Sequence, residues 1–478
     1  MKISLTKILQ IVNFTSLILT WYLFITEGGN EYINLTSVIL CTILSIQAYL
    51  FLKYADKQNN PLIFILSFQL VIYYVIRICT LLYVPYSMVF LRLNAIDFND
   101  CNYTLIFIIL SNIFLFLGIY LANTKEDIIS STSLSSSLYM NNNNDKIYGT
   151  RLVLIILFTY FLAFSDFLKF DSIVRLAGFV RSIFLNPYTI LLLSIVYFIY
   201  YFSVFDFKIK IFTILLIILF IVIVTLNGSR SGVLTIIVFY IIANLAIQKY
   251  ISFNYIYVVI LTFIILPLSL FLFLTSTYIR KVGADELNVK SKIDIVKNYE
   301  VDLSADNRLV FAPVFDRIGF FDYATEIIAH KQQYKEVFNL IFYSKSIIDN
   351  SLSPGFDVFD TPKLSNSLMF MYDDTLGSPS KKIVVDEYHS DEFTIYGEYY
   401  SLFWGYGSLV MFFITGYLFQ KILNRKSKLT GVTSAIQKAL VLLVFYTLIN
   451  SFGIDWLIFD LVGIFVCYFL FAKLIIRN

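Results

Sequence analysis

The sequence predicts an all-α integral membrane protein that crosses the bilayer about twelve times. Of its 478 residues 58% are hydrophobic and only 14% are charged, whereas soluble domains carry about a quarter charged residues. Its apolar runs approach the ~20 residues that cross a hydrocarbon core. These runs are continuous rather than alternating, which excludes a membrane β-barrel. The composition also excludes an ordinary cytosolic enzyme, a disordered protein and a nucleic-acid binder.

The twelve expected spans fall into a group of nine and a later group of three. The first run follows a basic N-terminus but lacks a small-x-small cleavage site, so it is expected to stay as an uncleaved span. The predicted spans are 7–26, 33–52, 61–83, 103–122, 150–166, 186–204, 211–227, 232–248, 255–277, 397–420, 436–450 and 453–473.

Lys and Arg predict the orientation, because they collect in cytoplasmic loops. With the N-terminus inside, most basic residues near the spans fall on the inner side, and both termini are then cytoplasmic. The basic residues left in short outer loops are Arg92, Lys169, Arg175, Arg181 and Arg230.

Two polar segments divide the chain, and the second is expected to contain the chemistry. A Ser- and Asn-rich stretch near 123–149 reads as a cytoplasmic linker between spans of the 1–277 unit. Residues 278–396 form one large outer, periplasmic loop before the last three spans in 397–478, and they contain both histidines. The inner loops carry no nucleotide-binding motif. An outer-face substrate must therefore bring its own leaving group, for which a lipid diphosphate is a natural choice.

Arg230 lies in an outer turn, Asn227-Gly228-Ser229-Arg230-Ser231-Gly232. Hydroxyls of Ser229 and Ser231 and turn amides beside a guanidinium form a cup for an anion. The alternative is a hairpin arginine that reaches to lipid headgroups.

Two further arginines lie in or beside the large outer loop. Arg280 follows the ninth span, where an interfacial anchor is the alternative interpretation. Arg317 lies in the segment Asp316-Arg317-Ile318-Gly319-Phe320-Phe321-Asp322, where Asp316 offers a simple surface partner.

Arg77 lies inside the third predicted span. A charge within the membrane is costly and must face a polar interior or a partner. Asp460, in the last span, is a candidate counter-ion, and a purely structural pair is the alternative to a functional one.

Two residues before the tenth span are candidate general bases. Glu398 is expected in the first turn of that span, where a carboxylate also simply caps a helix dipole. His389 titrates near neutrality, or it is only a solvated loop side chain. His330 and His389 lack the spacing of metal ligands, so neither a metal nor a cofactor is expected. Tyr334 to Ile348 is expected to hold a short helix at the outer membrane surface.

Three features together resemble the O-antigen polymerase (Wzy) family of oligosaccharide repeat-unit polymerases. They are the Gly-Ser-Arg-Ser-Gly turn at 228–232, the late outer loop, and Gly397-Glu398-Tyr399-Tyr400 leading into Phe403-Trp404-Gly405-Tyr406-Gly407. The resemblance implies a GT-C-like glycosyltransferase in the inner membrane of a Gram-negative bacterium. Such an enzyme transfers a growing undecaprenyl-diphosphate-linked glycan onto a new undecaprenyl-diphosphate-linked unit at the periplasmic face. Its expected partners are these oligosaccharides, membrane lipid and a chain-length regulator, with no nucleic acid.

The resemblance also implies roles for particular residues. Arg230, Arg280 and Arg317 correspond to a diphosphate-binding set, and His389 or Glu398 to the base, with Ser229, Ser231 and Arg77 in support. Two alternatives stay open. An O-antigen ligase would use a lipid A-core acceptor, and a flippase or transporter would have short loops on both faces.

Overall fold

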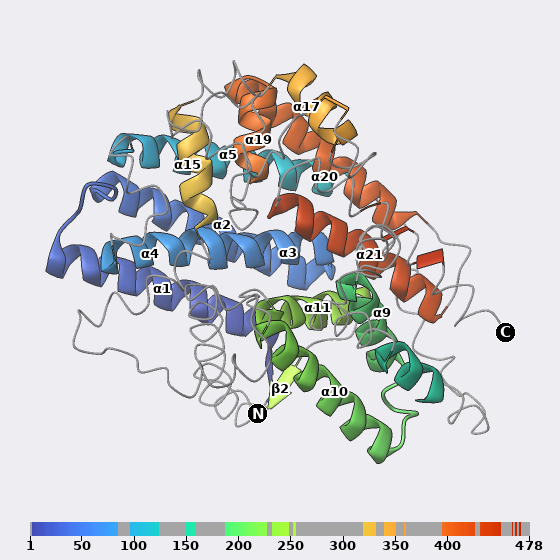
Figure 1. Cartoon of the computed structure of the whole chain (residues 1–478). Helices are drawn as coiled ribbons and strands as arrows, with labels where there is room; N and C mark the ends of the chain where they lie inside the picture. The colour runs from blue at the N-terminus through green and yellow to red at the C-terminus, as the bar shows by residue number, and fades with distance from the viewer. Residues whose placement is uncertain are drawn as a thin grey trace.

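The computed structural model describes a helical protein, and its long apolar helices are those of a membrane-embedded chain (Figure 1). Six of the described helices are long and apolar enough to cross a membrane. The described residues are 2–84, 96–123, 149–157, 187–226, 232–247, 252–254, 319–330, 339–349, 358–359, 394–425, 431–450, 461, 464–465 and 468–469.

The six candidate spans match the first four and two of the last three predicted runs. Further apolar helices cover parts of the middle group: α9 (Pro187–Tyr200), α10 (Phe207–Leu226) and α11 (Gly232–Ala246). The six are α1 (Leu5–Glu27), α2 (Leu35–Gln58), the continuous helix formed by α3 (Pro61–Gln69), η1 (Leu70–Val75) and α4 (Ile76–Tyr83), α5 (Phe98–Ala122), the helix Gly405–Asn424 that contains α20 (Ser408–Asn424), and α21 (Val432–Ile449).

Part of the predicted layout falls on residues that the structure does not describe. The span at 255–277 and most of the 123–149 linker and of the 278–396 loop lie outside the described ranges. The count of twelve spans and the GT-C-like arrangement remain predictions.

Side-chain caps determine where several spans begin. The Asn34 side chain accepts a hydrogen bond from the Ser37 amide at the start of α2. At the start of α5, the Asp97 side chain accepts hydrogen bonds from the Asn99 and Asp100 amides. Asn60 caps α3, whose first residue is Pro61. Asn and Asp are favoured caps and Pro is favoured at the first helical position, because each meets the unsatisfied amides of a helix start.

One short strand pair adds to the helices that the sequence predicts. β1 (Lys2–Ser4) and β2 (Ser252–Asn254) are antiparallel, with Ile3 opposite Phe253. The pair places the N-terminus beside the chain that follows α11, which agrees with the expectation that both lie on one side of the membrane.

α5 and α20 run parallel at very close range, because glycines remove side-chain bulk where they meet. A Cβ at Gly118 would overlap the carbonyl oxygen of Phe413, and a Cβ at Gly416 would overlap that of Leu115. Small residues allow such close backbone contact between membrane helices.

Hydrogen bonds identify the two ends of this bundle. At one end, Asn60 Nδ2 donates to Gln420 Oε1 at 2.9 Å, and Asn424 Nδ2 donates to the Ala122 carbonyl. At the other end, Asn30 Nδ2 donates to the Leu81 carbonyl at 2.9 Å. We call the second end, where α4 finishes and α2 and α5 begin, the Arg77 end.

The predicted tenth span, 397–420, is wrong in its boundary. The structure has a separate helix α19 (Ile395–Leu402), a turn at Phe403 and Trp404, the 3₁₀ turn η10 (Gly405–Gly407), and then α20. Trp404 and Gly405 both have left-handed backbone, with φ of 61° and 68°. Hydropathy stays high through this break, so an apolar run alone does not reveal it.

Two helices of the 278–396 segment are described, α15 (Phe320–Ala329) and α17 (Leu340–Ile347). The second lies within the stretch expected to form a short helix. In Figure 1, α15 (gold) lies at a steep angle to the long blue helices, and it packs against α19, α5 and η1. Within the described part of the polar segment, α15 therefore lies directly against the membrane helices.

Candidate functional site

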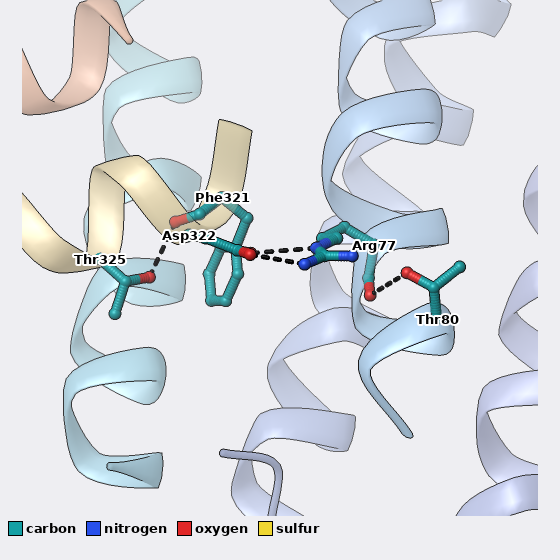
Figure 2. A network of polar contacts seen from close by, with 5 residues as sticks. All are labelled: Arg77, Thr80, Phe321, Asp322 and Thr325. Carbon is teal, nitrogen blue, oxygen red and sulfur yellow. Dashed lines mark hydrogen bonds and ion pairs between the residues drawn. The ribbon is translucent and has the colours of Figure 1, made fainter. Parts of the chain in front are cut away.

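A fully buried ion pair joins the third span to α15. Arg77 Nε donates to Asp322 Oδ1 at 3.0 Å and Nη2 donates to Oδ2 at 2.5 Å, and both side chains are 0% exposed. Figure 2 shows the guanidinium of α4 and the carboxylate of α15 pointing toward one another. Two parallel bonds match the fork of a guanidinium to a carboxylate, which is the geometry that a buried pair needs.

This pair shows the counter-ion of Arg77 to be Asp322. Asp460, the counter-ion considered from the sequence, lies outside the described residues. Asp322 occurs in the 316–322 segment that the sequence singled out for Arg317, and it is separated from Arg77 by 245 positions.

The backbone around the pair explains its placement. Arg77 lies two residues after η1, a π-helical segment of six residues, and such segments occur often at functional sites. The Thr80 hydroxyl donates to the Arg77 carbonyl, and that of Thr325 donates to the Phe321 carbonyl (Figure 2). Asp322 lies in the first turn of α15, where the helix dipole stabilises a carboxylate.

Two more ionisable groups follow Asp322 along α15. Glu326 is 0% exposed and His330, which caps the helix, keeps 20% of its side chain exposed. His330 Nδ1 lies 2.7 Å from Glu326 Oε1. The spacing of four residues places both on one face of the helix.

The surroundings raise the pKa of both groups. Burial raises the pKa of the Glu326 carboxyl, and the charge of His330 partly offsets this. Interaction with Glu326 raises the pKa of His330 above its usual value, with a smaller contribution from Asp100 of α5, while burial opposes the rise. The pair therefore holds a proton more firmly than its separate members would in water.

Glu398, a base candidate from the sequence, is fully buried in the first turn of α19. The Thr394 hydroxyl accepts a hydrogen bond from the Gly397 amide and caps the helix. Gly397 lies against Ile327 of α15, so that an added Cβ would come 2.5 Å from Ile327 Cδ1. The Glu398 segment and the Asp322–His330 segment are thus packed directly together.

Tyrosines fasten α19 to the spans. The Tyr396 hydroxyl donates to Asn112 Oδ1 at 2.8 Å, and its ring meets Tyr74 edge-on. The hydroxyls of Tyr399 and Thr415 lie 2.9 Å apart. These contacts therefore hold α19 in place against the spans.

The other site residues predicted from the sequence lie outside the described residues. They are Ser229, Arg230, Ser231, Arg280, Arg317 and His389.

Sequence reasoning missed the joint role of three residues on α15. Asp322 was considered only as part of a motif and His330 only as a metal ligand, while Glu326 received no role. The signal was present in the four-residue spacing of Asp322, Glu326 and His330. Interpreting it required knowing that this part of a polar loop is a helix.

Within the described ranges, no group of three His, Cys, Asp or Glu side chains is arranged to hold a metal ion. Comparison with protein-family models, with curated proteins and with solved structures finds no match. The fold and the site therefore define the protein as a helical membrane protein with a buried arginine–carboxylate pair and an adjoining glutamate–histidine pair at one end of its bundle.

Proposed function

We propose that this protein is a polyprenyl-diphosphate-dependent glycan polymerase, the O-antigen repeat-unit polymerase that its motifs resemble. It would transfer a growing undecaprenyl-diphosphate-linked glycan to a new lipid-linked unit at the periplasmic face. The supporting observation is the Arg77–Asp322 pair, which holds a helix of the polar loop against the membrane helices. An enzyme that joins lipid-linked sugars needs such a contact between a polar segment and membrane helices, because its substrate has an apolar tail and a polar head.

The transfer separates charge in a way that these residue types suit. The acceptor hydroxyl loses a proton while the anomeric carbon becomes oxocarbenium-like. The departing diphosphate carries concentrated negative charge, and guanidinium groups match phosphate oxygens and stay protonated. Arg230, Arg280 and Arg317 are the proposed diphosphate ligands. Arg77 has a supporting role, since its guanidinium already binds Asp322.

The test replaces Arg230, Arg280 and Arg317 singly by Ala and examines the length of the lipopolysaccharide chains in cells. Loss of one preorganised donor to a developing charge removes about 3 kcal/mol of transition-state stabilisation, or ~100-fold in rate. Each variant is expected to give short chains, whereas the control Arg425→Ala at the opposite end of the bundle leaves them long. Long chains from all three well-expressed variants would refute the proposed mechanism.

An O-antigen ligase is separated from a polymerase by a deletion strain. Loss of a polymerase leaves lipid A-core bearing a single repeat unit, and loss of a ligase leaves bare core. We expect the single unit.

A transporter is the second candidate, because the third span has the buried charge and irregular helix that such proteins use. Arg77 is fully enclosed and η1 interrupts the α-helical ladder just before it. Purified protein in detergent offers no barrier to cross, so chain extension under those conditions excludes pure transport.

A further inference from the structure

The helix α21 ends inside the bundle, beside the middle of the third span. Gln69 Nε2 donates to the carbonyl oxygen of Ile449, the last residue of α21, at 2.9 Å. Gln69 is the ninth residue of a span of 23 residues, about 13 Å from its start, and so lies near the middle of the ~30 Å hydrocarbon core. The carboxyl end of α21 is therefore deep in the membrane.

Two polar side chains at this helix end are buried without complete hydrogen bonding among the described residues. Gln69 is 0% exposed, and its Oε1 has no partner, although its Nε2 binds the Ile449 carbonyl. Asn450, which follows Ile449, is 4% exposed, and neither its Oδ1 nor its Nδ2 has a partner. Such groups are costly within a membrane unless a bound species satisfies them. We therefore expect an occupant at this helix end.

The contact between Gln69 and Ile449 brings the unpartnered oxygens together. Nε2 and Oε1 of Gln69 belong to one amide group, so Oε1 also lies close to the Ile449 carbonyl oxygen. Asn450 is the next residue in the chain, so its side chain begins beside the same carbonyl. The hydroxyls of Tyr73 and Tyr446, 3.0 Å apart, join the same two helices nearby. One small ligand can therefore contact both side chains and the helix end.

The charge at this point favours a cation. The carboxyl end of a helix carries partial negative charge, and its last four carbonyls have no partner within the helix. Helix ends of this kind coordinate sodium ions or protons inside membrane transporters. Arg77, further along the same span, adds little opposing charge, because Asp322 balances it.

The ligand atoms indicate the kind of cation. Sites for calcium and magnesium usually include carboxylates. The oxygens of Gln69, Asn450 and the Ile449 carbonyl belong to uncharged amide and peptide groups, which balance less charge. They therefore suit a monovalent ion.

We propose that a monovalent alkali cation binds at the carboxyl end of α21, held by Gln69 Oε1, Asn450 Oδ1 and the Ile449 carbonyl oxygen. The π-helical segment η1 begins at the residue after Gln69, so the third span is irregular at this point. The ion fixes the end of α21 against that span. This inference does not depend on the proposed function, because a buried ion can hold the bundle of an enzyme or of a transporter.

The experiment measures ion binding by the purified full-length protein in detergent. The probes are radioactive sodium and, separately, radioactive rubidium, which stands in for potassium, with choline chloride keeping the ionic strength constant. One saturable site per chain is expected for at least one of the two ions. The chloride salt of that ion should also raise the melting temperature over the same concentration range, as a ligand of the folded state does.

Two variants change the site in opposite directions. Asn450→Leu removes one oxygen and leaves the contact of Gln69 with Ile449 in place. Its dissociation constant should rise ~10-fold or more, because even groups that only support a bound metal contribute that much to its affinity. Gln69→Glu keeps an oxygen at its position and adds a negative charge, so it should bind the ion more tightly.

Gln47→Leu is the matched control. Gln47 of α2 is also buried, its Nε2 donates to the Ile109 carbonyl at 3.1 Å, and its Oε1 has no partner among the described residues. That carbonyl lies within α5 (Phe98–Ala122) rather than at a helix end. The control should therefore bind the ion with wild-type affinity.

Absence of saturable binding of either ion would overturn the inference and show that water alone satisfies the two amides. Wild-type affinity in a folded Asn450→Leu protein, or an equal loss in Gln47→Leu, would also overturn it, because the ion would then lie elsewhere. If Asn450→Leu does not fold, the affinity of Gln69→Glu decides, and no gain over the wild type counts against the site. These results leave the polymerase proposal intact.

Discussion

At the scale of the residue, Arg77 binds Asp322 and so holds α15, a described helix of the polar loop, against the membrane helices. Its two hydrogen bonds to Asp322 close a pair from which water is excluded. A buried pair adds little net stability over apolar residues, but removing one partner strands the other charge. The pair therefore fixes the position of α15 against α4 and adds little to the net stability of the fold.

Arg77→Ala should lower the free energy of unfolding by about 3–5 kcal/mol, since it leaves the Asp322 carboxylate buried without the guanidinium that balances its charge. Chemical or thermal unfolding in detergent measures this. The double variant Arg77→Met with Asp322→Leu should recover most of the loss. An Arg77→Ala protein as stable as the wild type would contradict the pair's role.

The pH dependence of α15 docking follows from its two raised pKa values. For His330, a folded-state pKa above the usual 6.5 gives stabilisation that is complete below that value and is lost as the pH rises through the raised one. The contribution of Glu326 to stability also falls as the pH rises. Its buried carboxyl ionises as the pH rises above 4.5, and the charged form disfavours the folded state. α15 should therefore be docked least firmly in alkaline solution.

Hydrogen exchange of α15 amides, corrected for intrinsic rates, tests this dependence. Protection should fall between about pH 6 and pH 9, and His330→Asn should flatten the change. Equal protection of wild type and variant across this range would contradict the assignment.

At the scale of the element, the contact of α5 with α20 depends on Gly118 and Gly416. Neither position has room for a Cβ beside the backbone of the facing helix. Gly416→Val should destabilise the protein by about 1–3 kcal/mol or more through overpacking. Gly407→Ala is the matched control, because nothing lies within 4 Å of its added Cβ. Equal melting temperatures for the two variants would refute the close packing.

Elements with local signals could be predicted from sequence, and those defined by distant contacts could not. The third span begins and ends as predicted, because Asn60 and Pro61 mark its start. The tenth span does not begin where it was predicted to begin, because the left-handed Trp404 occurs inside an unbroken apolar run.

The candidate site shows the same division between local and distant signals. The sequence indicated that Arg77 needs a partner, since an isolated charge in a membrane is costly. It could not select Asp322, because that pairing depends on how the loop folds back. The contact of Glu326 with His330 is local, but it is readable only once α15 is known to be a helix.

At the scale of the whole molecule, the proposal requires the Arg77 end to face the periplasm. Cysteine labelling tests this in a Cys467→Ser background, in which the native Cys41, Cys79 and Cys101 are buried. A membrane-impermeant maleimide applied to spheroplasts should label Glu31→Cys, at an exposed position between α1 and α2 at the Arg77 end. Lys57→Cys, at the opposite end of the bundle, should be labelled only after the membrane is opened. The reverse pattern would place the site in the cytoplasm.

The most direct test of the account is extension of lipid-linked repeat units by the purified protein in detergent. The account predicts products that grow by whole units, with free undecaprenyl diphosphate released at each step. Units that remain single in detergent, yet are moved across the bilayer by the same protein in vesicles, would show a transporter and contradict it.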